Sequence, residues 1–405
     1  MTTPPVSVIV VSRHRAAALM RCIVALTQQD HPNFELIVVA DPEAIRQAKT
    51  LPLPLKCVVF DEPNISAARN AGLAVAAAPV VAFIDDDAVA EPTWLWRLTA
   101  PFANPDVTAS TGFIRGRNGI SYQWQACEVD PFGQDHPLPI TAPTLRANTP
   151  QRAVKTQGTN CAFRRDALLA IGGFDPAYRF YLDEADVNLR MAGQSFPGLT
   201  AIIPDAQVHH GYLASARRAA NRVPLSLHDI AASTAIFLRR HAPEADKTAA
   251  LKALSMRESV RIATHRRAGR IDAQAEFALL ISLTQGWAEG LAHPLIALPP
   301  LSPSTTPLQP LNTGPRPGKI ISGRFWQKRR LLAEASASTA KITTVFLFTP
   351  TARPHKLSFQ PEGYWLQTGG IFGQSTRQGP RFRLISFRKR VEEETARLAR
   401  YRPTN

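Results

Sequence analysis

The chain has 405 residues, of which 45% are hydrophobic and 20% charged, as in ordinary globular proteins. This length exceeds the size at which one core stops growing, so it predicts more than one domain. Residues 301–405 hold 18 Lys/Arg against 5 Asp/Glu, whereas the rest of the chain holds 29 against 27, so the net charge of +15 lies mostly in the C-terminal quarter. The longest apolar stretch, 71–84, is broken by Pro79 and is too short to span a membrane as a helix.

The amino-terminal residues and the cysteines indicate the compartment. Residues 1–5 have no basic segment ahead of an apolar run, so no signal peptide is expected. The four cysteines are widely spaced without a C-x-x-C pair: Cys22, Cys57, Cys127 and Cys161. We therefore expect reduced thiols in a cytoplasmic protein.

Residues 6–114 alternate apolar β-rich runs with helical patterns, which is typical of βαβ units on a parallel sheet. The expected strands are Val6–Val11, Phe34–Val39, Lys56–Phe60 and Val80–Ile84, and the expected helices are Ala16–Gln28 and Ile65–Ala78. Asn64 is placed to cap the second helix, and Pro79 to end it.

The later part of the chain changes character several times. Residues 115–152 are rich in Gly, Pro, Asn and Thr and read as a long functional loop. A helix is expected at Asp183–Ala192, residues 225–290 are expected to be mainly helical, and the eight prolines of 291–317 indicate a linker. Beyond it we expect helices at Arg324–Ala337 and Arg388–Arg400 and strands at Thr343–Phe348 and Phe382–Phe387.

Three consecutive aspartates, Asp85, Asp86 and Asp87, follow the strand expected at Val80–Ile84. Open α/β sheets bind their ligands at the carboxyl ends of strands, where carboxylates can hold a divalent cation. The alternative is a solvated acidic turn.

Several further motifs follow in order along the chain: Ser12-Arg13-His14-Arg15 after the first strand, Asp41 after the second, Ala67-Ala68-Arg69-Asn70-Ala71-Gly72, the aspartate triplet, Gly172-Gly173-Phe174-Asp175 and Asp183-Glu184-Ala185-Asp186. This succession resembles the family-2 glycosyltransferases, over about residues 5–215. The resemblance implies a GT-A fold, a nucleotide-binding mixed sheet flanked by helices. The predicted division is a catalytic domain at 1–215, a helical extension at 216–290, a linker at 291–317 and a small basic α+β domain at 318–405.

The resemblance also implies roles for the acidic residues. Asp85 and Asp87 match the D-x-D motif that holds Mn²⁺ or Mg²⁺ on the leaving diphosphate, and Asp86 shapes the turn beside the nucleotide-sugar. Of the following histidines, His209 and His210, one is expected to be a third ligand, with His210 favoured.

The E-D-x-D element of the family supplies the general base that takes the proton of the acceptor hydroxyl. It matches Asp183, Glu184 and Asp186, and Glu184 is the first choice. Without the resemblance, three acids in a first helical turn would be read as stabilising the helix dipole.

The remaining matches concern the two substrates. For the nucleotide-sugar, the resemblance implies contacts from Ser12, Arg13, Asp41, Arg69, Asn70, Asp85 and Asp86, although a surface ion pair is an alternative for Arg69. The family commonly has two acids after its second strand, and here the first is Ala40, so the base that is recognised stays open. For the acceptor, the candidates are Asn160, Gly173 and Asp175.

Together these features predict an inverting, metal-dependent, non-processive glycosyltransferase of the hexosyltransferase type, acting in polysaccharide biosynthesis on a hydroxyl of a glycan or lipid-linked acceptor. One alternative is a sugar-phosphate nucleotidyltransferase, although 12–15 lacks the glycines of such enzymes. Another is a non-catalytic protein whose basic C-terminal module binds RNA or an anionic surface.

The basic C-terminal quarter suggests a contact at the inner face of an anionic membrane, made by clusters such as 328–330 and 388–390. Nucleic acid is the less favoured partner. Four aromatic residues of this region offer faces for base stacking but are more readily read as its core: Phe325, Trp326, Tyr364 and Trp365.

Overall fold

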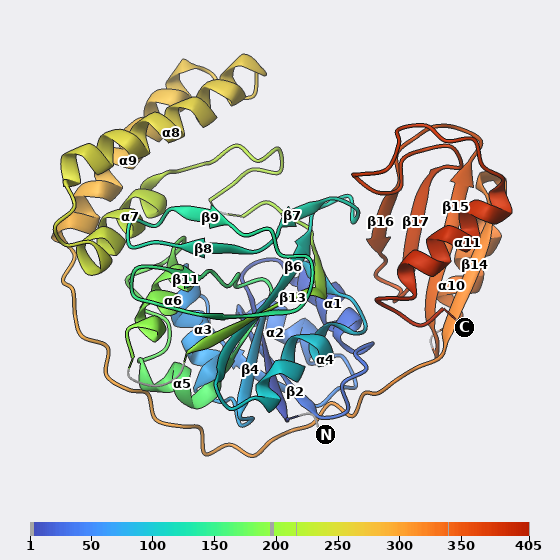
Figure 1. Ribbon diagram of the computed structural model, residues 1–405, viewed down its shortest axis with the longest axis horizontal. Coiled ribbons are helices and arrows are strands. Elements are labelled where there is room, and N and C mark those ends of the chain that lie inside the picture. Colours follow the sequence, from blue (N-terminus) through green and yellow to red (C-terminus); the bar gives the residue numbers. More distant parts are fainter. Residues whose placement is uncertain (1–3, 195–197, 216, 339, 405) are drawn as a thin grey trace.

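The computed structural model describes residues 4–194, 198–215, 217–338 and 340–404. Its largest unit is a ten-stranded mixed sheet in the order β10-β13-β6-β12-β4-β1-β2-β3, with β5 paired to β13 and β7 to β6 (Figure 1). The strands are β1 (Val6–Ser12), β2 (Phe34–Ala40), β3 (Leu55–Val59), β4 (Val80–Asp85), β5 (Ala88–Ala90), β6 (Val107–Arg115), β7 (Tyr122–Trp124), β10 (Thr144–Ala147), β12 (Cys161–Arg164) and β13 (Leu199–His210). The predicted mixed sheet is confirmed.

Helices cover both faces of this sheet because its strands are apolar on both sides. The helices are α1 (Ala16–Leu26), α2 (Pro42–Ala48), α3 (Ile65–Leu73), α4 (Trp94–Thr99), α5 (Arg165–Ala170) and α6 (Asp183–Ala192), with a 3-10 turn at Ala100–Ala103. One core cluster joins α1, α2 and α4 to the sheet, and a second joins α3, α5 and α6 to the opposite face. Asn64 caps α3 as predicted, accepting a hydrogen bond from the backbone N–H of Ala67.

The strand pairing brings two distant segments together at the carboxyl edge of the sheet. β1 lies parallel to β2 and β4, with Val11 opposite Asp85 at their carboxyl ends. β5 pairs antiparallel with the end of β13, and Ala88 lies opposite His210. The aspartate turn between β4 and β5 therefore lies beside the last residue of β13.

The segment 115–152 is not the long loop that its composition predicted. It contains β7, β10 and two strands of a separate three-stranded sheet, β11-β8-β9, whose members are β8 (Cys127–Val129), β9 (Asp135–Pro137) and β11 (Ala153–Val154). Each strand is only two to four residues long. Such short strands between Gly and Pro residues leave little periodicity to detect.

Residues 225–290 are mainly helical, as predicted, and form α7 (His228–His241), α8 (Lys247–Arg267) and α9 (Ala273–Ala292). The α8–α9 hairpin projects from the body of the molecule (Figure 1). The proline-rich segment that follows runs along the ten-stranded sheet, where the backbone N–H of Leu311 donates to the carbonyl of Phe34 in β2. The backbone N–H of Gln309 donates to the carboxylate of Glu35.

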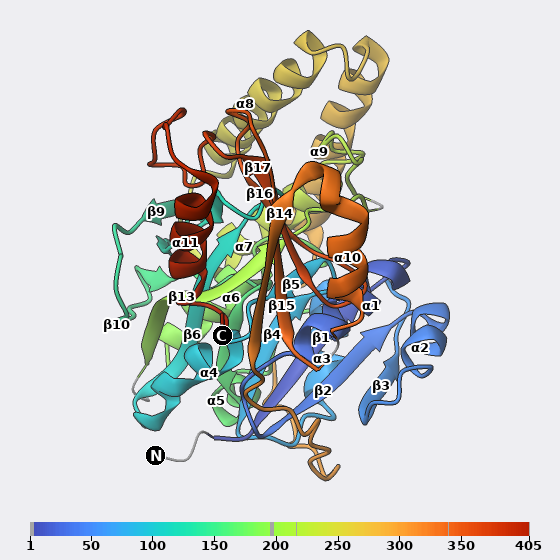
Figure 2. The same cartoon turned by 90° about the vertical axis from the view of Figure 1, so that its right-hand side faces the viewer.

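The C-terminal part forms a four-stranded sheet, β14-β15-β17-β16, with α10 and α11 against it (Figure 2). Its elements are β14 (Gly318–Arg324), a 3-10 turn η2 (Phe325–Gln327), α10 (Lys328–Ser336), β15 (Ile342–Thr349), β16 (Lys356–Phe359), β17 (Trp365–Gly370) and α11 (Phe387–Leu398). The predicted strand at Phe382–Phe387 is wrong. Phe382 makes only an isolated bridge to Gly373, and Ser386 caps α11 by accepting from the backbone N–H of Lys389.

The C-terminal sheet and the ten-stranded sheet share a core and a buried ion pair. Ala25, Val89 and Ile120 of the catalytic part lie in one apolar cluster with Trp365 and its neighbours. The guanidinium of Arg402, fully buried, donates to Glu91 at 2.9 Å through Nε and lies 3.6 Å from the ring centroid of Trp365. Among the described residues, no helix is both long and apolar enough to cross a membrane.

Candidate active site

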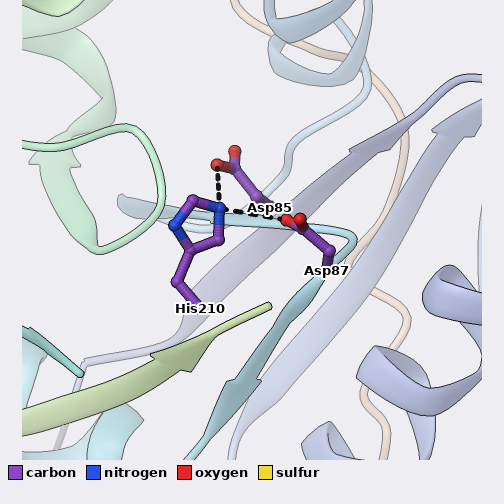
Figure 3. A group of neighbouring side chains, drawn as sticks. All are labelled: Asp85, Asp87 and His210. Carbon is purple, nitrogen blue, oxygen red and sulfur yellow. Dashed lines mark ion pairs between the residues drawn. The ribbon is translucent and has the colours of Figure 1, made fainter. Parts of the chain in front are cut away.

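The aspartate turn and the end of β13 form a cluster of three potential metal ligands. One ligand atom from each of Asp85, Asp87 and His210 lies within 4.8 Å of the others. The Nε2 atom of His210 is 3.1 Å from Oδ1 of Asp87 and 4.0 Å from Oδ2 of Asp85. Figure 3 shows the imidazole pointing toward both carboxylates. The pairing of β5 with β13 creates this arrangement, because it fixes Ala88 opposite His210.

Asp87 and His210 are charged partners in this cluster. Burial alone would raise the pKa of Asp87, but the hydrogen bond and charge of His210, together with Arg15, hold that pKa well below its usual range. Burial alone would lower the pKa of His210, and Asp87 raises it above its usual value. The second oxygen of Asp87 accepts from the backbone N–H of Leu213 at 2.7 Å. Asp87 therefore also anchors the segment that follows β13.

Asp86 points away from the metal-ligand cluster and into the protein. Its Oδ2 accepts from the hydroxyl of Ser12 at 2.6 Å and from Nε of Arg15 at 3.0 Å. Burial raises its pKa to about 7, with the charge of Asp87 adding to the effect and Arg15 opposing it. This agrees with the predicted role of Asp86 in shaping the turn, and it places Ser12 behind the turn.

Arg69 connects the aspartate turn to the acids of α6. Its guanidinium is 3% exposed and forms ion pairs with Asp183, with Glu184 at 3.2 Å and with Asp85 at 3.8 Å. Asp85 also accepts a hydrogen bond from the hydroxyl of Thr159. The structure thus brings Arg69 into the site, although its contacts here are with the protein itself.

The two leading acids of α6 differ in exposure. The side chain of Glu184 is 18% exposed and that of Asp183 is 4% exposed. Burial raises the pKa of Asp183 well above its usual value, and the nearby charge of Glu184 adds to this. Burial would also raise the pKa of Glu184, but Arg69 holds it below its usual value, so Glu184 stays ionised.

Two hydrogen bonds hold the Oε1 atom of Glu184. It accepts from the backbone N–H of Gly158 at 2.8 Å and from Arg69 at 3.2 Å. The carboxyl group of Asp183, whose pKa is raised, is a further hydrogen-bond partner of Glu184. Gly158 is required at this place, because an added Cβ would lie 1.8 Å from the Arg69 guanidinium.

Asp186, the third predicted acid, lies apart from the other two. Its side chain is fully buried and is bound by two arginines and a histidine: Arg190 at 2.6 Å, Arg240 at 3.2 Å and His241 at 2.9 Å. Burial would raise its pKa, and these partners lower it to about 2. Asp186 joins α6 to α7 and does not line the crevice. The prediction that Asp186 belongs to the catalytic acids is therefore corrected.

His209 is not part of the metal-ligand cluster. Because neighbouring residues of a strand point to opposite faces, its side chain faces away from the aspartates. Its Nε2 lies 2.8 Å from Oε1 of Glu91, and its ring is 5.1 Å from that of Trp365. The sequence could not separate the two histidines, and the structure favours His210 alone.

Two of the residues predicted to contact the nucleotide use their polar side-chain atoms to bond to the protein backbone instead. Both carboxylate oxygens of Asp41 accept backbone N–H groups, from His14 at 2.7 Å and Ala44 at 3.1 Å. The amide of Asn70 is bonded in both directions to the backbone of Phe174. Asn70 therefore fixes the 172–175 turn, which corrects its prediction as a nucleotide ligand.

The predicted acceptor residues are also held within the fold. Asn160 is fully buried and bonds Trp94 at 2.7 Å and the carbonyl of Ala206 at 2.8 Å. Asp175 is 5% exposed and pairs with Arg240 at 2.6 Å. Gly173 has a φ of 69°, and an added Cβ would lie 2.5 Å from the amide oxygen of Asn70. The glycine turn serves close packing, and these contacts correct the acceptor-side prediction.

A crevice of about 220 Å³ opens in front of the metal-ligand cluster. It is lined by Ser12, Arg13, Arg15, Asp85, Asp87 and His210 from the strand ends and by Phe60, Asn64 and Ile65 from the adjoining segments. A larger cavity of about 1170 Å³ lies beside it, under α7 and α8. Phe180, Arg217 and Arg218 line both, so the two spaces are adjacent.

Sequence reasoning missed Arg15 and Thr159 as members of this site. Arg15 pairs with Asp86 and lies 3.5 Å from Asp87. Arg15 stands in the 12–15 motif, and a polar side chain that follows the first strand of a βαβ unit was the available signal for it. Thr159 lies in the turn before β12, next to the predicted Asn160.

The ligand atoms of the cluster fit a divalent cation of the manganese or magnesium type. Two carboxylates and one imidazole are suitable for Mn²⁺, whereas Mg²⁺ favours oxygen ligands. The 25% exposure of Asp85 leaves this side of the cluster open to a ligand from the crevice.

Comparisons with known proteins match the part of the chain that contains the aspartate turn. Residues 7–172 match the family model described as Glycosyl transferase family 2. The chain is 28% identical over 172 residues to a glucosyl-dolichyl phosphate glucuronosyltransferase from Haloferax volcanii, which covers 40% of this chain and 53% of the relative. The predicted resemblance to this family is confirmed for the matched segment.

Two further proteins show partial similarity. Glycosyltransferase AglE of the same organism is 33% identical over 105 residues, or 24% of this chain and 34% of the relative. The solved structure of a mannosyltransferase from Pyrobaculum calidifontis, in complex with GDP-Man and Mn²⁺, covers 71% of this chain and 87% of its own at 20% identity, with a TM-score of 0.42. The chain spans about half, or less, of the length of the curated relatives that it matches.

Proposed function

We propose that this protein is an inverting glycosyltransferase of the hexosyltransferase type that transfers one sugar from a nucleotide-sugar to an acceptor hydroxyl, without processive chain extension. The family-model match over residues 7–172 supports the reaction class. The observation that carries the proposal is the convergence of Asp85, Asp87 and His210 at one crevice, with Glu184 linked to it through Arg69. We further propose the GT-A type of fold and the four-part division of the chain given above.

In this proposal the crevice at the ends of β1 and β4 receives the donor. Asp85, Asp87 and His210 would hold Mn²⁺ or Mg²⁺. A divalent cation held there offsets the negative charge that develops on the departing nucleoside diphosphate. Arg13 and Arg15 line the same crevice and add positive charge near the diphosphate.

Glu184 is the proposed general base. A hydroxyl has a pKa far above 7, so its proton must be removed as its oxygen attacks. Glu184 Oε2 accepts this proton, the acceptor oxygen forms a bond to the anomeric carbon, and the bond from that carbon to the diphosphate oxygen breaks on the opposite side. This single displacement inverts the configuration of the anomeric carbon.

Arg69 and the N–H of Gly158 hold the Glu184 carboxylate in place through its other oxygen. The same arginine keeps Glu184 ionised before the acceptor arrives. Arg69 thereby acts as a positioning residue, and the predicted direct contact between Arg69 and the nucleotide is not needed to explain its burial.

The acceptor is proposed to be a glycan or a lipid-linked precursor in polysaccharide biosynthesis. The larger cavity beside the donor crevice supports this, because it has the volume for an acceptor longer than one sugar. Its lining combines Phe132, Phe180 and Leu238 with Arg218 and Arg222. The predicted cytoplasmic location and a peripheral contact with an anionic membrane remain part of the proposal.

Release of free nucleoside diphosphate from a panel of UDP-sugars and GDP-sugars, with and without Mn²⁺, tests the proposed function. We expect release to require both the cation and an acceptor. Hydrolysis products with retained configuration would contradict inversion, and activity unaffected by EDTA would contradict the metal site. Formation of pyrophosphate from a nucleoside triphosphate would instead identify a nucleotidyltransferase.

A further inference from the structure

The strongest unassigned surface lies on the C-terminal sheet, where β14 leads into α10. Phe325 is 57% exposed and Trp326 is 74% exposed, so these aromatic side chains are not core residues, contrary to the prediction. Tyr364 and Trp365 do form core, at 5% and 0% exposure. Two exposed aromatic rings next to one another are uncommon on a monomeric surface and indicate an interaction site.

Three basic residues follow these aromatic side chains directly. Lys328, Arg329 and Arg330 are all exposed, and among the described residues they form no ion pair. No acidic residue stands in the first turn of α10. Basic side chains at the start of a helix do not stabilise it, so the helix itself does not account for their presence. We call Phe325, Trp326, Lys328, Arg329 and Arg330 the aromatic-basic patch.

A second segment of similar composition lies at the same end of the C-terminal sheet. β14 and β15 are parallel, α10 begins at the carboxyl end of β14, and Phe387 at the start of α11 contacts Phe348 near the carboxyl end of β15. The segment just before α11 exposes Phe382 by 54% and Leu384 by 80%. Both helices therefore begin at one end of this sheet, although they pack on its opposite faces (Figure 2).

We propose that the aromatic-basic patch, supported by this second segment, docks the protein on an anionic lipid bilayer. Tryptophan and phenylalanine enter the headgroup region, while lysine and arginine side chains attract anionic lipids. Exposed apolar groups at two separate places at one end of the sheet fit an extended flat surface better than a single groove-bound ligand. Leu384 is aliphatic and has no π-face for stacking on a nucleic-acid base, which favours lipid over RNA.

The sequence predicted that both basic clusters, 328–330 and 388–390, contact the membrane, and the structure favours the first. Of residues 388–390, Arg388 pairs with Glu392 at 2.8 Å, and Arg390 is buried against Glu394 and the carbonyl of Ile371. Only Lys389 of that run is free of an ion pair among the described residues. The charge offered to a membrane comes chiefly from 328–330. This inference does not rest on the proposed glycosyl transfer.

The test is co-sedimentation of the full chain with vesicles of phosphatidylcholine containing phosphatidylglycerol, compared with vesicles of phosphatidylcholine alone. Each basic residue near an anionic surface contributes about 1 kcal/mol, so K328Q/R329Q/R330Q should weaken partitioning about hundredfold. Trp326→Ser should weaken partitioning when introduced alone. Added to K328Q/R329Q/R330Q, it should weaken partitioning further. High salt should release the wild-type protein.

The matched control is K49Q/K252Q/R267Q, which removes three exposed basic residues elsewhere on the chain. Equal loss of binding in both triple variants would overturn the assignment to this patch, as would equal wild-type binding to neutral and anionic vesicles. Preferential binding of single-stranded RNA, lost in the 328–330 variant, would identify a nucleic-acid surface instead. Because all the altered side chains are exposed, unchanged thermal unfolding is expected in each variant.

Discussion

Two clusters of three acidic residues, one on the turn after β4 and one in the first turn of α6, differ in their surroundings. On the β4 turn, Asp85 and Asp87 face an open crevice together with an imidazole. On α6, arginine and histidine side chains already occupy most of the carboxylate oxygens. The first cluster has free ligand positions, and the second is largely neutralised from within.

This difference shows that the partners of an acidic residue decide its chemistry more than its place in a motif. Asp86 and Asp186 are the middle and last acids of their motifs, and both are bound by arginine inside the protein. Asp87 lines the crevice, and Glu184 keeps 18% of its side chain exposed. The following changes test this contrast, from the largest expected effect to the smallest.

Replacing Asp87 by Asn should have the largest effect, because it removes one negative charge from the metal-ligand cluster while an amide oxygen can still accept from Leu213. Loss of a cation that offsets leaving-group charge is worth several kcal/mol, so kcat/KM should fall by about a thousandfold or more. Nucleoside diphosphate should no longer raise the melting temperature in the presence of Mn²⁺. Asp166→Asn, at an exposed acid beside Arg165, is the control and should change neither measurement.

Replacing Glu184 by Gln should lower kcat by about two to four orders of magnitude, the usual contribution of a positioned proton acceptor. The amide oxygen of Gln can still accept from the N–H of Gly158, so Mn²⁺ and donor affinity should stay unchanged. Calorimetric titration and single-turnover kinetics measure the two properties separately. Near-normal turnover would move the base to Asp183.

Replacing Asp186 by Asn should affect stability and leave kcat within a few-fold of wild type. The folded-state pKa of Asp186 is about 2, below the usual value of 3.8, so the unfolded chain takes up the proton first as pH falls. Its contribution of about 2 kcal/mol is present above pH 4 and is lost as pH falls toward 2. Urea unfolding at pH 7 and at acidic pH should show a less stable variant with a weaker pH dependence. Loss of turnover without loss of stability would return Asp186 to the catalytic group.

Replacing His209 by Gln should have the smallest effect, a loss of about 1 kcal/mol in unfolding free energy from the weakened hydrogen bond to Glu91. Its affinity for Mn²⁺ should remain that of the wild type, whereas His210→Gln should bind Mn²⁺ more weakly. Isothermal titration of both variants makes the comparison. Equal loss of Mn²⁺ affinity in the two variants would contradict the separation of the histidines by the strand.

Much of the fold could be predicted because the catalytic strands and helices carry clear periodicity. β1, β2, β4, α6 and the helices of 225–290 appear where they were expected, whereas α3 begins at Ile65 as predicted but ends at Leu73, before the predicted stop at Pro79. The short strands of 115–152 and the irregular segment before α11 were misjudged. Their structure depends on pairing with residues distant in sequence, such as β10 with β13, which local composition does not encode.

For the candidate site, sequence motifs located the acidic residues but could not tell which way each side chain points. The motif around Gly158 contains Thr159, which bonds Asp85, and Asn160, which is buried against Trp94. Adjacent residues of this turn thus have different roles. Predictions for Asn70, Asn160 and Asp175 failed because tertiary contacts use their polar groups, and such contacts cannot be read from a local motif.

The buried pair of Glu91 and Arg402 has a consequence for how truncated forms of this chain are interpreted. Glu91 directly follows β5, beside the aspartate turn, and its arginine partner lies more than three hundred residues later in the sequence. The C-terminal part both packs over this place, through Trp365, and supplies the positive charge that neutralises the carboxylate. A polypeptide shortened at the proline-rich segment would lose that counter-charge and leave Glu91 with His209 as its partner in the ten-stranded sheet. Such a deletion therefore reports on the ten-stranded sheet as much as on the part removed.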